Sequence, residues 1–107
     1  MATRDSLPEG LLSDVKNYLD ITWDDEATDR KLSGLIASGM VYLDDKLGAA
    51  GDYVADGSPR TLLMEYVRYA RDSALDVFET NYQSLLLAMQ HGRLVQIYAQ
   101  DAIPAGQ

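Results

Sequence analysis

Four carboxylates, Asp24, Asp25, Glu26 and Asp29, form the densest group of potentially reactive side chains in this 107-residue sequence. Paired carboxylates can bind divalent cations or transfer protons. Their spacing lacks the alternating ligands and the central glycine of a calcium-binding loop, and residues 52–57, DYVADG, fail the same test. Because acidic side chains also stabilise the positive end of a helix dipole, we expect the group to begin a helix, with Thr22 or Asp24 as its N-cap.

Side chains suited to nucleophilic or metal chemistry are scarce. His91 is the single histidine and the chain has no cysteine, so neither a histidine-rich zinc site nor a cysteine–histidine pair can form. Ser33 and Ser38 lie in LSGLIASG, which is neither a nucleophile elbow nor a phosphate-binding loop. We therefore expect no enzymatic activity, no cofactor and no bound metal.

The composition is acidic. Seventeen acidic and nine basic side chains give a formal charge of -8, which repels phosphate and disfavours groove-reading DNA binding. No apolar run approaches the about 18 residues that span a bilayer, and the first ten residues contain no apolar signal segment. We expect a soluble, unsecreted protein of one domain that makes no contact with a membrane.

Helical spacing of apolar residues predicts the elements that position these side chains. A short helix is expected to begin after the capping-box pattern of residues 6–9, SLPE, and to carry an apolar stripe from Leu11 to Leu19. A longer helix begins at the acidic group and ends at Gly48, which suits a left-handed cap. Residues 48–58 contain three glycines and are expected to form a loop.

The second half of the chain is interpreted as two further helices. Ser58 is expected to be the N-cap of the first and Pro59 its first helical residue. The weakly helical residues 79–81, ETN, mark a bend before the second. His91 and Gly92 resemble a helix end. The predicted fold is all-α: a small bundle of about four helices in residues 1–92, with residues 93–107 as an extended C-terminal arm.

The helical stripes predict which side chains are buried. The predicted core includes Leu12, Val15, Leu19, Leu32, Leu35, Ile36, Met40, Leu43, Leu63, Val67, Ala70 and Leu86. Tyr18, Tyr66 and Tyr82 also lie on these stripes. Arg68 and Arg71 are expected on a solvated face, with salt bridges to Glu65, Asp72 or Asp76.

Other residues are candidates for contacts between chains. Gly34, Ala37 and Val41 give the long helix a second, smooth face, which permits close approach of a helix from the same chain or from a neighbouring subunit. Four amphipathic aromatics fall off the core stripes: Tyr42, Tyr53, Tyr69 and Tyr98. The C-terminal arm carries an apolar group without a predicted core partner: Leu94, Val95, Ile97 and Tyr98.

Three blocks of this sequence resemble the gp6-like family of phage head-tail connector proteins. In residues 11–48 a first helix ends in YL, an aspartate-rich link with an aromatic follows, and a long helix ends in LG. The other blocks are residues 60–68, RTLLMEYVR, and residues 78–89, FETNYQSLLLAM. The order and spacing of the blocks carry the resemblance, which covers most of residues 11–91.

The resemblance implies a structural protein that forms a ring beneath the portal protein, extends the DNA channel and docks the next connector or tail-completion protein. It implies neighbouring copies of the chain as partners and DNA that passes through the ring without specific binding. The expected location is the head-tail junction of the virion, and the bacterial cytoplasm during assembly. Within this interpretation, the smooth helix face, Tyr42 and Tyr69 become candidate subunit contacts, and the arm becomes the candidate for docking on the portal or a neighbour.

One alternative function class stays open on the sequence alone. A small acidic helical regulator that acts by protein–protein binding would share this composition. A helix-turn-helix DNA-binding module would need a basic recognition helix, which the sequence does not contain.

Overall fold

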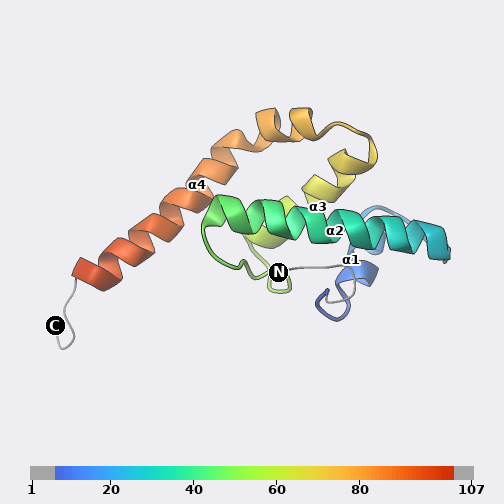
Figure 1. Cartoon of the computed structure of the whole chain (residues 1–107), viewed down its shortest axis with the longest axis horizontal. Coiled ribbons are helices and arrows are strands. Elements are labelled where there is room, and N and C mark those ends of the chain that lie inside the picture. Colours follow the sequence, from blue (N-terminus) through green and yellow to red (C-terminus); the bar gives the residue numbers. More distant parts are fainter. Residues whose placement is uncertain (1–6, 103–107) are drawn as a thin grey trace.

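A computed structural model describes the backbone of residues 7–102 and the side chains of residues 7–92. Its four helices are α1 (Leu11–Tyr18), α2 (Glu26–Leu47), α3 (Ser58–Arg71) and α4 (Leu75–Ala102). Residues 7–102 contain no β-strand, so the predicted all-α bundle is confirmed. Figure 1 shows α2 running beside α3, α1 packed near the N-terminal half of α2, and α4 continuing past the C-terminal end of α2.

The start and end of α2 follow from local sequence. The Asp25 side chain is the N-cap and accepts hydrogen bonds from the backbone N–H of Thr28 at 3.0 Å and from its hydroxyl at 2.7 Å. These two bonds lower the pKa of Asp25. Glu26 lies in the first turn, and Gly48 ends the helix with a φ of 80°, a conformation that costs glycine little. The helix start predicted at the acidic group is confirmed, but the N-cap is Asp25 and not the predicted Thr22 or Asp24.

The start of α1 differs from the predicted capping box. Gly10, with a φ of 82°, is the N-cap, and no side chain caps the helix. Ser6 of the predicted box lies outside the described residues. At the other end, Asp20 adopts a left-handed φ of 60°, which turns the chain toward the buried Ile21.

The prediction that the chain bends at residues 79–81 is wrong. The break lies at residues 72–74, where Ser73 adopts a left-handed φ of 54°. Residues 79–81 are helical, and the Thr80 hydroxyl donates to the Asp76 carbonyl at 3.1 Å. Weak helix formers are tolerated here because tertiary packing on both sides, through the buried Phe78 and the half-buried Tyr82, outweighs intrinsic propensity.

The predicted helix end at His91 and Gly92 is also wrong, because α4 runs on to Ala102. A glycine inside a helix costs only about 1 kcal/mol relative to alanine, and the next proline is Pro104. Residues 93–102 therefore continue α4, so this part of the predicted C-terminal arm is helical. Four predicted docking residues lie in this part of α4, and their side chains lie outside the described ones: Leu94, Val95, Ile97 and Tyr98.

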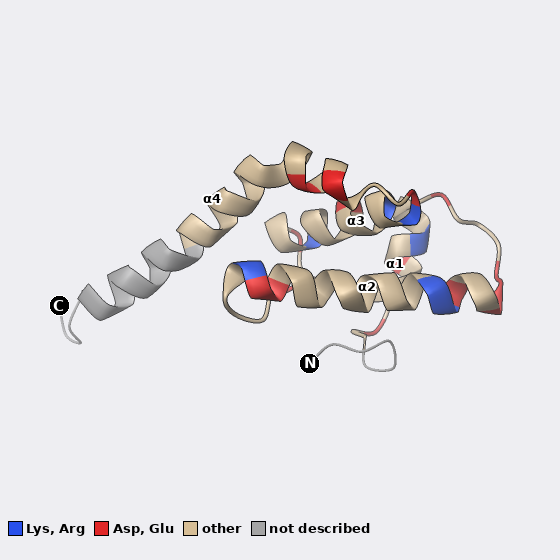
Figure 2. Ribbon diagram, turned by 45° about the horizontal axis from the view of Figure 1, so that its top comes forward, with Lys and Arg blue, Asp and Glu red and all other residues tan. Residues whose placement is uncertain are grey.

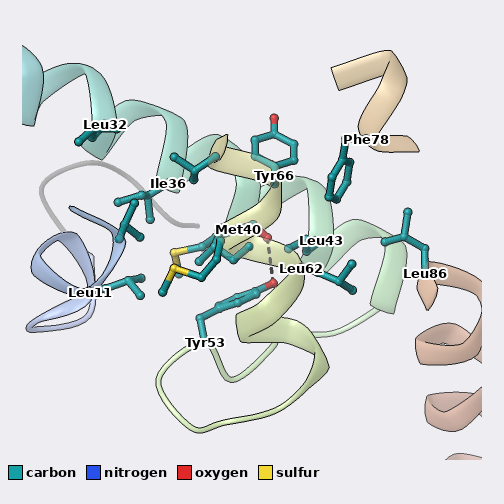
Figure 3. Packing of buried hydrophobic residues seen from close by; sticks show 14 of the residues in the cluster. Leu11, Leu32, Ile36, Met40, Leu43, Tyr53, Leu62, Tyr66, Phe78 and Leu86 are labelled. Carbon is teal, nitrogen blue, oxygen red and sulfur yellow. Dashed lines mark hydrogen bonds between the residues drawn. The ribbon is translucent and has the colours of Figure 1, made fainter. Parts of the chain in front are cut away.

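One hydrophobic core joins all four helices and the 48–57 loop (Figure 3). Eight of the predicted core residues are buried: Val15, Leu32, Ile36, Met40, Leu43, Leu63, Val67 and Leu86. The other four pack against the core and are partly buried: Leu12, Leu19, Leu35 and Ala70. Phe78 is fully buried, with its ring between 5.2 and 6.3 Å from the rings of four tyrosines: Tyr42, Tyr66, Tyr69 and Tyr82. This cluster joins α2, α3 and α4.

The close contact between α2 and α3 occurs at Gly39. A Cβ atom at this position would lie 2.8 Å from Leu63 Cδ1 and 2.8 Å from Tyr66 Cδ1. Only a residue without a side chain lets the two helices approach this closely. The smooth face predicted at Gly34 and Ala37 is half-buried, and α3 packs most tightly elsewhere on α2.

Candidate functional site

The most concentrated polar site in the described residues surrounds the carboxylate of Glu65, which is only 5% exposed. The Tyr18 hydroxyl donates to Glu65 Oε2 at 2.5 Å, and the Tyr82 hydroxyl donates to Oε1 at 2.5 Å. The Arg68 guanidinium donates to both oxygens, from Nη2 at 2.7 Å and from Nε at 3.0 Å. Since the four groups belong to α1, α3 and α4, one carboxylate connects three helices. We call these four residues the Glu65 cluster.

The pKa values in the Glu65 cluster reflect this arrangement. Burial alone raises the pKa of Glu65, but the hydrogen bonds from Arg68, Tyr18 and Tyr82 outweigh burial and hold this pKa below its usual value. The hydrogen bond to Glu65, together with burial, raises the pKa of Tyr18 to about 12. Glu65 is therefore ionised at neutral pH and already accepts four hydrogen bonds. A carboxylate that already accepts four hydrogen bonds within the chain suits a structural contact between helices.

A second carboxylate–tyrosine group lies at the C-terminal end of α2. The Tyr53 hydroxyl donates to Asp44 Oδ1 at 2.5 Å and contacts the Met40 carbonyl oxygen at 3.3 Å, the bond drawn in Figure 3. The Gly51 N–H donates to the same Asp44 oxygen at 2.9 Å. A Cβ atom on Gly51 would lie 2.9 Å from the Tyr53 ring, so the loop closes tightly around this side chain. We call Asp44, Gly51 and Tyr53 the Tyr53 cluster.

Two tyrosines are placed differently from the prediction. Tyr53 was expected to be a contact residue, but it is 3% exposed. Burial, and then the bond to Asp44, raise its pKa. Tyr18 was expected in the core, but it is 47% exposed and reaches Glu65 only through its hydroxyl. Neither outcome has a signal in local sequence, because each depends on a partner from another element.

The acidic group at the start of α2 forms salt bridges with Lys16 of α1. Lys16 Nζ lies 3.0 Å from Asp24 Oδ1 and 2.9 Å from Asp29 Oδ1. Its hydrogen bonds to Asp29 and Asp24 raise the pKa of Lys16. Among the described side chains, no group of three or more histidines and carboxylates is arranged to hold a metal ion. Trp23 in the same link is 52% exposed.

The predicted subunit-contact residues divide into two sets. Gly34 and Ala37 are half-buried, and Val41 is 45% exposed. Tyr42 and Tyr69 already pack within the chain: the Tyr42 hydroxyl donates to Glu79 Oε1 at 3.0 Å, and the Tyr69 hydroxyl accepts from Asn81 at 3.3 Å. Arg68 also lies over the Tyr69 ring, at 4.9 Å from its centroid. Of these five residues, Val41 is therefore the one that leaves most apolar surface exposed.

The sequence analysis missed a further surface on α4. Residues 80–90, TNYQSLLLAMQ, contain no charged side chain, and Figure 2 shows this part of α4 without red or blue. Five of its six exposed residues recur at helical spacing and so share one side of the helix: Thr80, Gln83, Ser84, Leu87 and Ala88. Leu87 is 55% exposed. We call these five residues the uncharged α4 face.

The described part of the chain includes no helix with the length and apolar character needed to span a membrane.

No protein-family model, curated protein or solved structure matches the chain.

Proposed function

We propose that this protein is a structural head-tail connector of a bacteriophage. In this role it forms a ring of identical copies beneath the portal protein, extends the DNA channel and docks the next connector or tail-completion protein. The proposal is carried by the order and spacing of residues 11–48, 60–68 and 78–89, which resemble the gp6-like connector family. Every hydrophobic residue that is buried in the described part of the chain lies in one of these blocks, apart from Tyr53. The resemblance thus covers the residues that make the fold.

The uncharged α4 face supports contacts with other proteins. The chain carries a formal charge of -8, yet this face has no charge and exposes Leu87. The centres of protein interfaces are depleted of charged residues, so this face suits a subunit or portal contact better than the acidic remainder. In a ring it would meet a different surface of the next copy, such as that around Val41, because head-to-tail contacts close by rotation.

The acidic surface fits a channel component. Phosphate groups that pass through the ring are repelled by a protein of this charge, so DNA slides without specific binding. Residues 93–102 of α4 remain the candidate for docking on the portal or on a neighbouring copy, through Leu94, Val95, Ile97 and Tyr98. The location that follows is the head-tail junction of the virion.

A portal-binding experiment tests this function. Purified protein is mixed with the portal ring encoded in the same genome, and the product is imaged by electron microscopy. We expect a second ring on the portal, lost in Leu87→Glu and retained in Val54→Glu, which adds the same charge to a valine that is 57% exposed in the loop. Thermal unfolding should be similar in the two variants.

The same experiment separates the two function classes. Failure of the wild-type protein to decorate the portal would overturn the proposal and favour a regulator that binds another protein. Portal decoration that survives Leu87→Glu would retain the connector function and remove the uncharged α4 face from the interface.

A further inference from the structure

The connection between α3 and α4 is short and strained. Only residues 72–74 separate the helices, and Ser73 holds a left-handed φ of 54°. The Ser73 N–H donates to the Ala70 carbonyl at 3.1 Å and the Ala74 N–H donates to the Tyr69 carbonyl at 2.9 Å, which is the pattern of a helix end that usually places glycine at this position. A residue with a side chain is disfavoured there.

The same connection can also form a straight helix. The connecting residues, Asp-Ser-Ala, include neither glycine nor proline, and helices flank them on both sides. If Ser73 took helical backbone angles, α3 and α4 would join into one continuous helix and the strain at Ser73 would disappear. The α4 side chains that now pack on the bundle, including the fully buried Phe78 and the Tyr82 partner of Glu65, would leave it and need a new partner.

We propose that this partner is a second copy of the chain, which exchanges α4 with the first. In the exchanged pair, α4 of each copy lies on α2 and α3 of the other. Each α4 remakes there the contacts seen within one chain: the Phe78 aromatic cluster, the Tyr82–Glu65 bond and the Tyr42–Glu79 bond. The surface under α4 fits this helix by construction, and only the connection changes conformation. The exchange of α4 requires only the purified protein and does not depend on the proposed function.

Two opposing changes at the connection test the exchange. The double variant Asp72→Ala with Ser73→Ala favours a continuous helix, because alanine has the highest helix propensity. Ser73→Gly favours the bent, closed monomer, because glycine adopts a left-handed φ without strain. Asp45→Ala is the matched control, since it raises helix propensity at an exposed position of α2 away from the connection. Each protein is warmed to the onset of unfolding, cooled, and analysed by size-exclusion chromatography with light scattering.

The expected dimer fraction differs among these proteins. It should rise at least about fivefold in the double alanine variant relative to Asp45→Ala, and fall below wild type in Ser73→Gly. A monomeric double variant would overturn the proposal. If the double variant does not fold, equal dimer fractions in wild type and Ser73→Gly would overturn it equally.

Cross-linking distinguishes exchanged dimers from paired closed monomers. Gln90 Nε2 donates to the Lys46 carbonyl at 2.7 Å, so these residues mark the α2–α4 contact. The chain has no cysteine, so Lys46→Cys with Gln90→Cys introduces the only two thiols. A short bismaleimide should link two chains in an exchanged dimer, giving a covalent dimer on a denaturing gel. Dimers that yield only cross-links within one chain would overturn the proposal.

Discussion

The Glu65 cluster and the Tyr53 cluster contain the same kind of hydrogen bond but stabilise different parts of the fold. In each, a tyrosine hydroxyl lies 2.5 Å from a carboxylate oxygen. Glu65 accepts bonds from α1, α3 and α4, whereas Asp44 accepts bonds from Tyr53 and Gly51 of the loop that directly follows its own helix. The first cluster therefore fixes how helices are arranged, and the second fixes the path of one loop.

The two clusters also differ in how the carboxylate charge is balanced. Glu65 has the Arg68 guanidinium on both oxygens, while Asp44 receives a hydroxyl and a backbone N–H. A hydrogen bond to a charged group contributes about 1.5 to 3 kcal/mol, and Glu65 accepts four such bonds whereas Asp44 accepts two. The loss of Glu65 should consequently affect the whole bundle, and the loss of the Tyr53 hydroxyl should affect mainly the loop.

The largest effect is expected from Glu65→Ala. This change leaves the hydroxyls of Tyr18 and Tyr82 and the guanidinium of Arg68 without their acceptor, and should lower the free energy of unfolding by about 2 to 4 kcal/mol. Urea denaturation followed by circular dichroism measures this. Glu79→Ala is the control, since Glu79 is exposed and accepts a single bond, from Tyr42. Equal losses in the two variants would remove the special role of Glu65.

A smaller and more local effect is expected from Tyr53→Phe. Removal of the hydroxyl should lower the free energy of unfolding by about 1 to 2 kcal/mol, because Asp44 loses a donor in a partly buried place. Amide hydrogen exchange should speed up in residues 48–57 and stay unchanged in α4. In Tyr69→Phe, which loses only the bond from the exposed Asn81, the loop should exchange as in wild type. Faster exchange across all four helices in Tyr53→Phe would show that the cluster is not local.

Acid and alkali should separate the clusters further. The pKa of Glu65 is lower in the folded protein than in the unfolded chain, so its contribution is complete above the unfolded value of about 4.3 and is lost as pH falls through the folded pKa. The pKa of Tyr53 is raised, so its contribution is complete below about pH 10 and is lost as pH rises. The stability gap between wild type and Glu65→Ala should narrow in acid, and the gap for Tyr53→Phe should narrow in alkali. Denaturation midpoints measured across the pH range test both expectations. A stability difference that does not change with pH would contradict the role given to that side chain.

The smallest effect is expected from Arg68→Lys. The Arg68 side chain is 51% exposed, so its pair with Glu65 is partly screened by water. A lysine keeps the charge but loses the two-pronged geometry, and we expect a smaller loss of unfolding free energy than in Tyr53→Phe. The Tyr18 and Tyr82 bonds to Glu65 remain. A loss as large as that of Glu65→Ala would mean that Arg68, rather than the two tyrosines, holds the cluster together.

Much of the fold could be predicted because its signals are local. Asp25 and Gly48 bound α2 through bonds to residues within four positions. Helix α3 begins at Ser58, one residue before the predicted start, because Gly57 and not Ser58 is its N-cap. The apolar stripes identified most of the core for the same reason, since helical periodicity needs no knowledge of neighbouring elements. The Arg68–Glu65 salt bridge was also predicted, from helical spacing alone, and is confirmed.

The break between α3 and α4, the burial of Tyr53 and the burial of Glu65 were decided by tertiary structure. The connection at Ser73 contains no glycine or proline from which a break could be predicted. Helix α4 bends back there because Phe78 and Leu86 are buried against the bundle. Local sequence does not predict the burial of Glu65. Its carboxylate is buried because Tyr18 of α1 and Tyr82 of α4 donate hydrogen bonds to it. The sequence by itself determined the helices and their apolar faces, because both depend on neighbours along the chain. Only the folded structure decided which polar side chains meet, because those contacts join residues far apart in sequence.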